Sequence, residues 1–123
     1  MDNISFEETL VGYYTWNVGP NLVYLDAVAA HLREFSPEQG ARGIPVEDFI
    51  AQIENGSRAR VAQAVYNSLT NGVFYDQECR IQLKAGGFRW LRTTGRVILD
   101  SDRLPIMAMG TVRDVTAGKV LLM

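Results

Sequence analysis

The feature that most constrains this sequence is its last third, where three β-strands are expected in succession. Apolar and polar residues alternate over residues 75–84, which is typical of a strand that buries one face. The turn at residues 85–87 contains two glycines, which adopt positive φ angles without steric cost. A second strand is predicted at residues 88–99 and a third at 106–115, so the three segments predict an antiparallel meander.

The upstream half predicts the elements that complete and cover this sheet. Residues 13–18 are rich in aromatic and β-branched side chains, and residues 22–25 follow as a second strand after a Gly-Pro-Asn turn. Asp26 and Ser36 stand where each is able to cap a short helix. This order predicts an α+β fold with a five-stranded antiparallel sheet and short helices on one face.

Further helical segments separate the first two strands from the meander. Residues 45–53 predict a short helix, and Ser57 is expected to cap the longest helix, at residues 58–69, which ends before Gly72. At the start of the chain, residues 1–11 carry a capping-box pattern and are expected to form an amphipathic N-terminal cap helix.

Charge and cysteine content restrict the partners of the chain. The net charge of −2 argues against a nucleic-acid partner, because such binding depends on clustered basic charge. The sequence contains no run of about 18 apolar residues, the length that a membrane-spanning helix needs, and no direct membrane contact is expected. Cys79 is the single cysteine, so an internal disulfide is excluded and a reducing, cytoplasmic location is expected. One cysteine and one histidine do not predict a metal site.

Five segments of the chain, taken in order, resemble the PAS domain family. They are residues 12–17 (GYYTWN), 35–39 (FSPEQ), 78–81 (ECRI), 87–91 (GFRWL) and 110–116 (GTVRDVT). The resemblance extends over residues 12–116, which are therefore expected to form the domain, and residues 117–123 are expected to begin a C-terminal linker.

The resemblance implies a sensory module whose sheet and helices enclose a small pocket. Such domains bind a ligand or dimerise, and they pass a signal to an effector in the same polypeptide, often a histidine kinase or a cyclic-dinucleotide enzyme. The sequence does not name the ligand or a cofactor. It argues against haem, because the long helix lacks the histidine that haem-binding relatives use. It also argues against a flavin–cysteine adduct, because Cys79 stands in a strand and outside an Asn-Cys-Arg-Phe context.

The inward residues of the predicted meander are unusually small, which predicts a ligand pocket beneath the helices. The candidate strand residues are Cys79, Ile81, Leu91, Thr93, Gly95, Ala108, Gly110 and Val112. The candidate helix residues are Phe35, Phe49, Ile53 and Tyr66. The alternative is that these four large helix side chains fill the space, as close packing demands.

The opposite face of the same strands carries large apolar side chains, namely Phe88, Trp90, Ile98, Met107 and Met109. A soluble monomer seldom leaves such residues together in solvent. We expect them to be covered either by the N-terminal helix, through Ile4, Phe6 and Leu10, or by a second subunit. The second arrangement predicts a homodimer.

Asp114 and Thr116 end the last predicted strand and are candidates for a signal relay. In the PAS family this Asp-x-Thr pattern lies where the sheet joins the outgoing segment. Asp114 is expected to bond backbone amides or to pair with Arg80 or Arg113, and Thr116 is expected to cap the outgoing segment.

Two other functions remain as alternatives. A small-molecule-converting enzyme on an α+β cone fold would need an acid–base pair in its pocket, drawn from Asp26, Glu54, Glu78 or His31, and the sequence places none of these convincingly. The other alternative is a pure dimerisation module with a filled core.

Overall fold

The fold is α+β, as the sequence predicts, and the computed structural model describes residues 10–121. Its elements in chain order are β1 (Gly12–Asn17), β2 (Leu22–Leu25), α1 (Ala27–Leu32), α2 (Pro37–Arg42), α3 (Val46–Gln52), α4 (Asn55–Asn71), β3 (Tyr75–Gln82), β4 (Phe88–Leu99), β5 (Pro105–Asp114) and α5 (Thr116–Leu121). The cap helix expected at residues 1–11 lies almost entirely outside the described residues.

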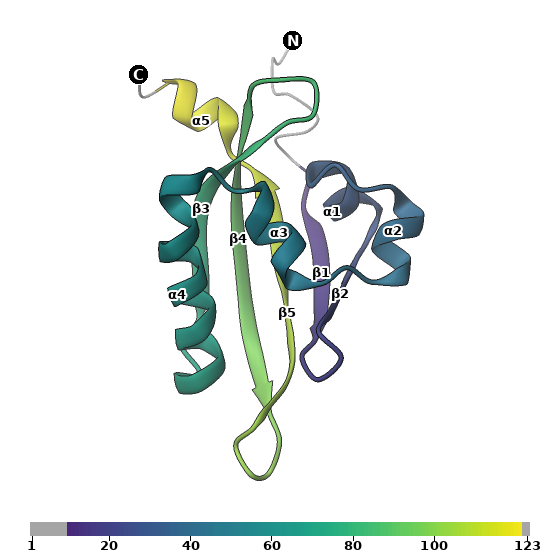
Figure 1. The fold of residues 1–123 in the computed structure, drawn as a ribbon, viewed down its shortest axis with the longest axis vertical. Coiled ribbons are helices and arrows are strands. Elements are labelled where there is room, and N and C mark those ends of the chain that lie inside the picture. Colours follow the sequence, from purple (N-terminus) through teal and green to yellow (C-terminus); the bar gives the residue numbers. More distant parts are fainter. Residues whose placement is uncertain (1–9, 122–123) are drawn as a thin grey trace.

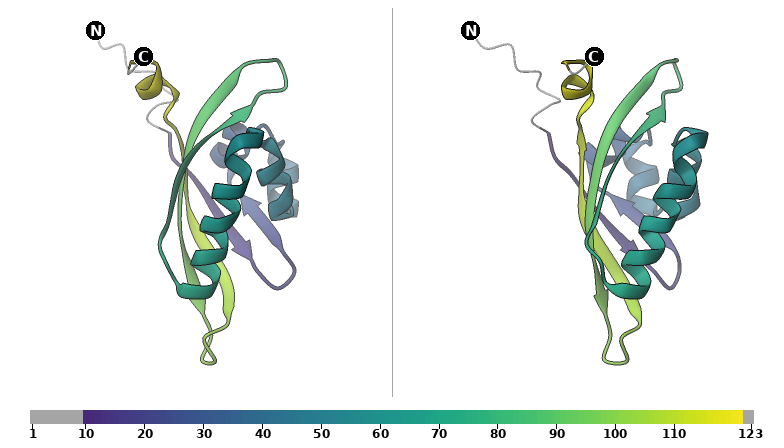
Figure 2. Two further views of the ribbon diagram at one scale, coloured as in Figure 1. Left: turned by 60° about the vertical axis from the view of Figure 1, so that its left-hand side comes forward. Right: turned by 90° about the vertical axis from the view of Figure 1, so that its left-hand side faces the viewer.

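The five strands form one antiparallel sheet in the order β2-β1-β5-β4-β3. The last strand, β5, lies at the centre, because it pairs both with β4 and with the first strand, β1. Helices α1 to α4 come between β2 and β3 in the chain and cross one face of the sheet (Figures 1 and 2). Helix α5 begins where β5 ends and lies next to β4, on the side of the sheet away from helices α1 to α4 (Figure 2).

The strand register confirms the two faces expected from the alternation. Cys79 lies opposite Leu91, and Thr93 lies opposite Val112. Residues directly opposite each other in an antiparallel pair share a face of the sheet. The inner face therefore combines residues from all three strands of the meander and is the face that the helices cover.

The expected helix caps at Asp26 and Ser36 are confirmed, whereas Thr116 is itself the first residue of α5 and its hydroxyl accepts the N–H of Trp90 instead. The carboxylate of Asp26 accepts a hydrogen bond of 2.8 Å from the backbone N–H of Ala29. Ser36 forms a full capping box with Gln39. These bonds satisfy N–H groups that the first turn of a helix leaves without partners.

The prediction that Ser57 caps the longest helix was wrong, because α4 begins two residues earlier, at Asn55. Tertiary contacts decide this boundary. Ile53 forms a β-bridge with Ile81, and the Glu54 carboxylate lies 2.7 Å from Nε of Arg80. The chain is thus fixed to β3 just before the helix begins, and Ser57 donates its hydroxyl to Glu54 from inside the helix.

The apolar core lies between the inner sheet face and the helices. Leu32, Ile81 and Leu91 are its largest fully buried side chains. Helix α1 packs directly onto β1 at Gly12, where an added Cβ would come within 2.5 Å of the backbone nitrogen of Ala29. Within the described part of the chain, no helix combines the length and apolarity needed to cross a bilayer.

Candidate functional site: a cavity under the sheet and its exit

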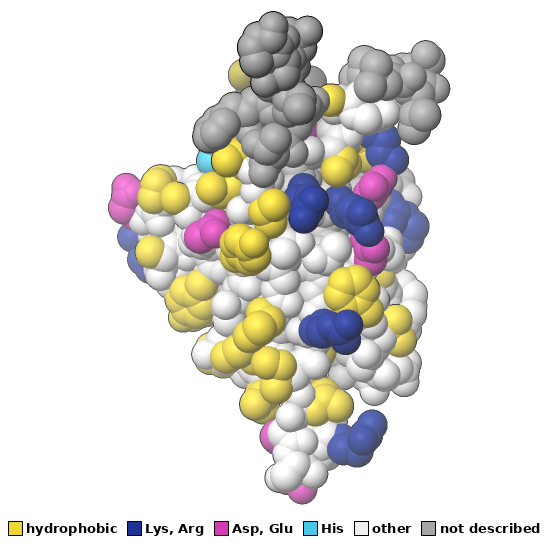
Figure 3. Space-filling view, turned by 180° about the vertical axis from the view of Figure 1, so that it is seen from behind, with side chains coloured by type: hydrophobic (Ala, Val, Ile, Leu, Met, Phe, Trp, Pro, Cys, Tyr) yellow, Lys and Arg dark blue, Asp and Glu magenta, His cyan; other side chains and the backbone are white. Residues whose placement is uncertain are grey.

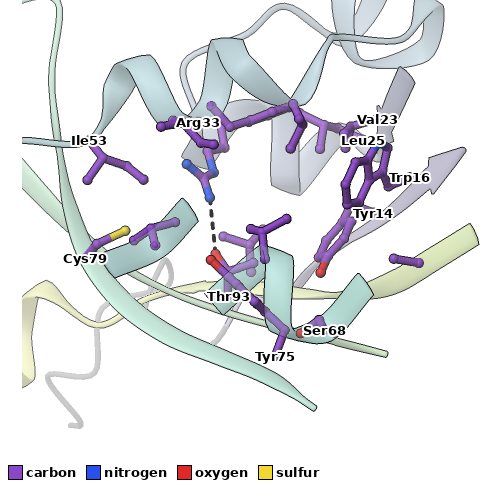
Figure 4. A pocket seen from close by; sticks show the side chains of 18 of the residues that line it. Tyr14, Trp16, Val23, Leu25, Arg33, Ile53, Ser68, Tyr75, Cys79 and Thr93 are labelled. Carbon is purple, nitrogen blue, oxygen red and sulfur yellow. Dashed lines mark hydrogen bonds between the residues drawn. The ribbon is translucent and has the colours of Figure 1, made fainter. Parts of the chain in front are cut away.

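A cavity of about 100 Å³ lies between the inner face of the sheet and the helices. All five strands contribute to its lining, together with α3, α4 and the residue that follows α1 (Figure 4). The lining residues are Tyr14, Trp16, Val23, Leu25, Arg33, Val46, Phe49, Ile50, Ile53, Val61, Val65, Ser68, Tyr75, Cys79, Thr93, Gly95, Val97, Ala108 and Val112. The site is therefore mostly apolar, with a few polar groups.

The cavity includes many of the residues expected to line it. These are Phe49, Ile53, Cys79, Thr93, Gly95, Ala108 and Val112. Gly95 keeps the site open, because a Cβ there would come within 2.2 Å of the Tyr14 hydroxyl. Small residues on the inner face thus leave space that neither Phe49 nor Ile53 fills.

Five other expected residues do not line it, each for a packing reason. Ile81 and Leu91 are completely buried within the packed core, and Gly110 faces the backbone of β4. Phe35 packs edge-on against Phe49, with ring centroids 5.4 Å apart. Tyr66 is 60% exposed on α4 and does not reach the interior.

The sequence did not single out several lining residues, including Tyr14, Trp16, Arg33, Ser68 and Tyr75. A signal existed for most of them. Tyr14 and Trp16 alternate with the exposed Tyr13 along β1, and Ser68 lies one helical repeat from Val61 and Val65 on α4.

Arg33 is the charged residue of the lining and is only 8% exposed. Its Nη2 donates to the hydroxyl of Thr93 at 3.2 Å, and its Nη1 donates to the side-chain oxygen of Gln52 at 3.4 Å (Figure 4 draws the Thr93 bond). Gln52 in turn donates to the backbone oxygen of Arg33, and the guanidinium carbon lies 5.3 Å from the centroid of the Phe49 ring. Three side chains therefore hold the guanidinium at the cavity wall.

The charge of Arg33 has no carboxylate partner within residues 10–121. Burial lowers the pKa of the guanidinium from its usual value. A guanidinium nevertheless stays protonated in proteins, so the cavity contains a buried positive charge at neutral pH.

The other titratable groups of the lining are neutral at pH 7. Burial raises the pKa of Tyr75 to about 12 and also raises the pKa of Tyr14, whose hydroxyl donates to the backbone oxygen of Thr94. Burial likewise raises the pKa of the Cys79 thiol. These groups present hydroxyls and a thiol, not anions, to the cavity.

The four candidate acid–base residues lie outside this lining. Asp26 caps α1, Glu54 pairs with Arg80, and Glu78 pairs with Lys119. His31 is exposed on α1. None of them is placed to exchange a proton with a molecule in the cavity.

Asp114 and Thr116 form a bonded junction between the sheet and α5. Thr116 donates its backbone N–H to the Asp114 carboxylate at 2.9 Å, and its hydroxyl accepts the backbone N–H of Trp90 at 2.8 Å. The bond to the Thr116 amide is the first of the two arrangements expected for Asp114. The other, an ion pair with Arg80 or Arg113, is not formed, because the carboxylate pairs instead with Arg89, whose Nε lies 3.5 Å away.

The sheet register explains this choice of partner. Asp114 lies opposite Leu91, so it shares a face with Leu91 and with Arg89 two residues earlier on β4. Arg80 lies opposite Trp90 and therefore faces the other side of the sheet.

Arg89 also connects this junction to the cavity. Its Nη1 donates to the backbone oxygen of Leu32 at 2.7 Å and to that of His31 at 3.3 Å. These carbonyls end α1, where a cation is favoured by the helix dipole, and Arg33 is the next residue. One side chain thus bridges the segment that carries the cavity arginine and the carboxylate at the exit.

The outer face of the sheet carries the apolar residues expected there. Met107 lies opposite Ile98, and Phe88, Ile98 and Met109 are all exposed. Figure 3 shows apolar side chains on this face interrupted by basic ones. Two basic side chains lie over its aromatic rings: Arg80 over Phe88 and Lys119 over Trp90. Of the expected covering residues, Leu10 is half-buried, and Ile4 and Phe6 lie outside the described residues.

Comparison with known families agrees with this architecture. A family model described as PAS fold matches residues 23–112, which is most of the chain. This chain belongs to the PAS family. The resemblance found in the sequence is thereby confirmed, and no curated protein matches the chain significantly.

Solved structures with the same fold include domains of signalling proteins. A sensory box histidine kinase/response regulator from Burkholderia thailandensis is 26% identical, with a TM-score of 0.79, and the match covers 91% of this chain and 82% of that one. The N-terminal domain of a diguanylate cyclase with a PAS/PAC sensor, from Marinobacter aquaeolei, is 15% identical with a TM-score of 0.78, covering 89% and 99%. A domain of a putative light and redox sensing histidine kinase from Haloarcula marismortui is 21% identical with a TM-score of 0.73, covering 89% and 93%.

Proposed function

We propose that this PAS domain is the sensory input module of a cytoplasmic signalling protein, and that it binds a small molecule in the cavity under its sheet. The cavity is the observation that carries the proposal. Protein interiors are normally packed to the density of organic crystals, and voids larger than a water molecule are few. Here a space of about 100 Å³ lies where all five strands meet α3, α4 and the residue that follows α1.

The effector is an attached domain in the same polypeptide, of the histidine kinase or cyclic-dinucleotide class. Two observations favour this. The similar structures named above come from histidine kinases and a diguanylate cyclase. The chain also leaves the sheet through a bonded junction at Asp114 and Thr116.

The signal travels from the cavity to α5 through Arg89. A ligand that displaces the segment around Arg33 alters the carbonyls of His31 and Leu32, to which Arg89 donates. Because Arg89 also pairs with Asp114, such a shift changes the support of the first turn of α5. This route needs no movement of the sheet.

A cavity-filling substitution tests the binding proposal. Xenon enters apolar cavities, so we expect it to shift the amide NMR signals of Val61, Cys79 and Val112. Ala108→Leu places three more carbons in the cavity and should reduce these shifts several-fold, whereas Ala59→Leu, on the exposed side of α4, should leave them unchanged.

Two other outcomes of the xenon experiment would contradict the binding proposal. Absence of xenon shifts in the unmodified domain would contradict a ligand cavity and favour a dimerisation module with a filled core. Equal shifts in the Ala108→Leu variant would place the xenon elsewhere and would also contradict the proposal.

A further inference from the structure

We propose that the cavity binds a small organic monoanion, a carboxylate with a compact apolar body, and that Arg33 is its anchor. This inference rests on the proposed function, because it takes the cavity to be the ligand site. It concerns the chemical class of the ligand, which the fold alone does not specify.

The first argument is the uncompensated charge of Arg33. Removing a guanidinium from water is costly unless a counter-charge and well-formed hydrogen bonds replace its hydration. Arg33 is 8% exposed, and its partners Thr93, Gln52 and Phe49 are all neutral. An anion in the cavity would supply the missing charge.

The second argument is the unused bonding capacity of the same group. A guanidinium carries five N–H donors. Two donate to Gln52 and Thr93, which leaves three without an acceptor among the described residues. A carboxylate accepts two parallel N–H bonds from such a fork, and this geometry favours arginine over lysine as its partner.

The third argument is that the arginine is held in place before any ligand arrives. Gln52 contacts it twice, through the guanidinium and through the backbone oxygen, and the Phe49 ring lies beside it. An anchor with a fixed geometry loses less conformational freedom on binding. The Arg33 side chain is thus preorganised for ligand binding.

The rest of the lining limits the ligand to one negative charge. Arg33 is the sole charged side chain that the described lining contains, so a dianion such as phosphate would leave one charge uncompensated in an apolar site. Tyr75 and Ser68 are neutral. Most other lining groups are aliphatic or aromatic, and they favour an apolar ligand body.

The size of the cavity limits that body to a few carbon atoms. The volume of about 100 Å³ is smaller than the roughly 150 Å³ of an engineered cavity that holds benzene. A short branched or straight-chain carboxylic acid fits this limit.

An acid and its amide of the same shape provide the test. Isovalerate and isovaleramide differ in charge and hardly in volume. Inorganic phosphate serves as the dianion probe when all three compounds are compared at a pH well above the second pKa of phosphate, where the dianion predominates. At constant ionic strength, we expect isovalerate to raise the melting temperature in a saturable way, by on the order of 5 °C. Isovaleramide and phosphate should each raise it by less than about a fifth of that.

Variants of Arg33 connect this response to the proposed anchor. Arg33→Met should abolish the isovalerate shift, and Arg33→Lys, which keeps the charge but loses the fork, should weaken the affinity at least about tenfold. The matched control is Arg92→Met, because Arg92 is exposed on the outer face, where it pairs with Asp76. That variant should respond as the unmodified domain does.

Four results would overturn the inference. Equal stabilisation by isovalerate and isovaleramide would show that the negative charge of the ligand does not matter. An isovalerate response that survives in Arg33→Met would show that Arg33 is not the anchor. Stabilisation by phosphate through Arg33 would contradict the monoanion. If xenon enters the cavity and acetate, butyrate and isovalerate all fail to stabilise the domain, the anion preference is wrong and the ligand cavity stands. If xenon also fails, the proposed function itself is wrong.

Discussion

Arg33 is the residue whose environment differs most from what its chemistry normally requires. Its guanidinium lies at a cavity wall and has only neutral partners. Other arginines of the described chain, such as Arg80, Arg92 and Arg58, lie nearer the surface and bond to carboxylates or backbone oxygens. A buried charge without a counter-charge is costly, so we expect it to reduce the stability of the empty domain and the proposed anion to offset that cost. We therefore expect Arg33 to favour ligand binding while lowering the stability of the ligand-free domain.

The stability of the ligand-free domain tests this opposition. Arg33→Met replaces the buried charge with an apolar side chain of similar length, and we expect the free energy of unfolding to stay unchanged or to rise by about 1–4 kcal/mol. Thr93→Val keeps the charge and removes one of its partners, so it should lower the free energy of unfolding by about 1–3 kcal/mol. Urea denaturation at pH 7 measures both. A large loss of stability in Arg33→Met would show that the arginine supports the empty fold.

In the proposed relay, the elements that matter most are α1 and α5, which are short and are connected through hydrogen bonds and an ion pair of Arg89. Arg89 on β4 binds the last carbonyls of α1 and the carboxylate before α5. A six-residue helix is not stable by itself, so its position depends on the contacts at its ends. We therefore expect both helices to respond to a small change at Arg33.

Asp114→Ala should break this path without closing the cavity. It removes the Arg89 pair and the acceptor of the Thr116 N–H, so the amides of α5 should exchange hydrogen faster. Isovalerate should protect α5 in the unmodified domain and no longer protect it in the variant, while its affinity changes less than about twofold.

Asp102→Ala is the matched control, because Asp102 is an exposed residue of the β4–β5 turn. Equal loss of isovalerate affinity and of α5 protection in Asp114→Ala would contradict a relay role and show that Asp114 supports the binding site.

The whole molecule presents two contrasting sides, one covered by helices and one apolar in part and exposed (Figures 2 and 3). Tyr13, Phe88, Ile98 and Met109 are all exposed on the strands of the sheet. Exposed apolar residues gathered on one face commonly mark an interaction surface. We propose that a second copy of the domain covers this face.

Light scattering on the purified domain tests the dimer. Met109→Glu places a charge in the centre of the proposed interface, and we expect it to weaken the dimer at least about tenfold. Tyr66→Glu is the control, because Tyr66 is similarly exposed but lies on α4, on the helical side of the sheet. A monomer at millimolar concentration, or a dimer that survives in Met109→Glu, would exclude this interface.

Patterns of short range were enough to predict much of the fold. Alternation along β3 to β5 predicted both faces of the sheet, because successive side chains on a strand point to opposite sides whatever lies above them. The capping roles of Asp26 and Ser36 were likewise predictable, since each bond joins residues three apart. The family motifs then identified the fold, whereas the order of the strands within the sheet comes from the structure.

The sequence by itself thus determined which residues face inward, which face outward, and where the chain leaves the sheet. The tertiary structure alone decided that a cavity remains, that Tyr66 stays out of it, and that Arg33 enters it and reaches Thr93, sixty residues away in the chain. It also decided that Asp114 pairs with Arg89. The physical reason is that cavities and buried charges depend on how separate elements pack together, and no local period or spacing encodes that packing.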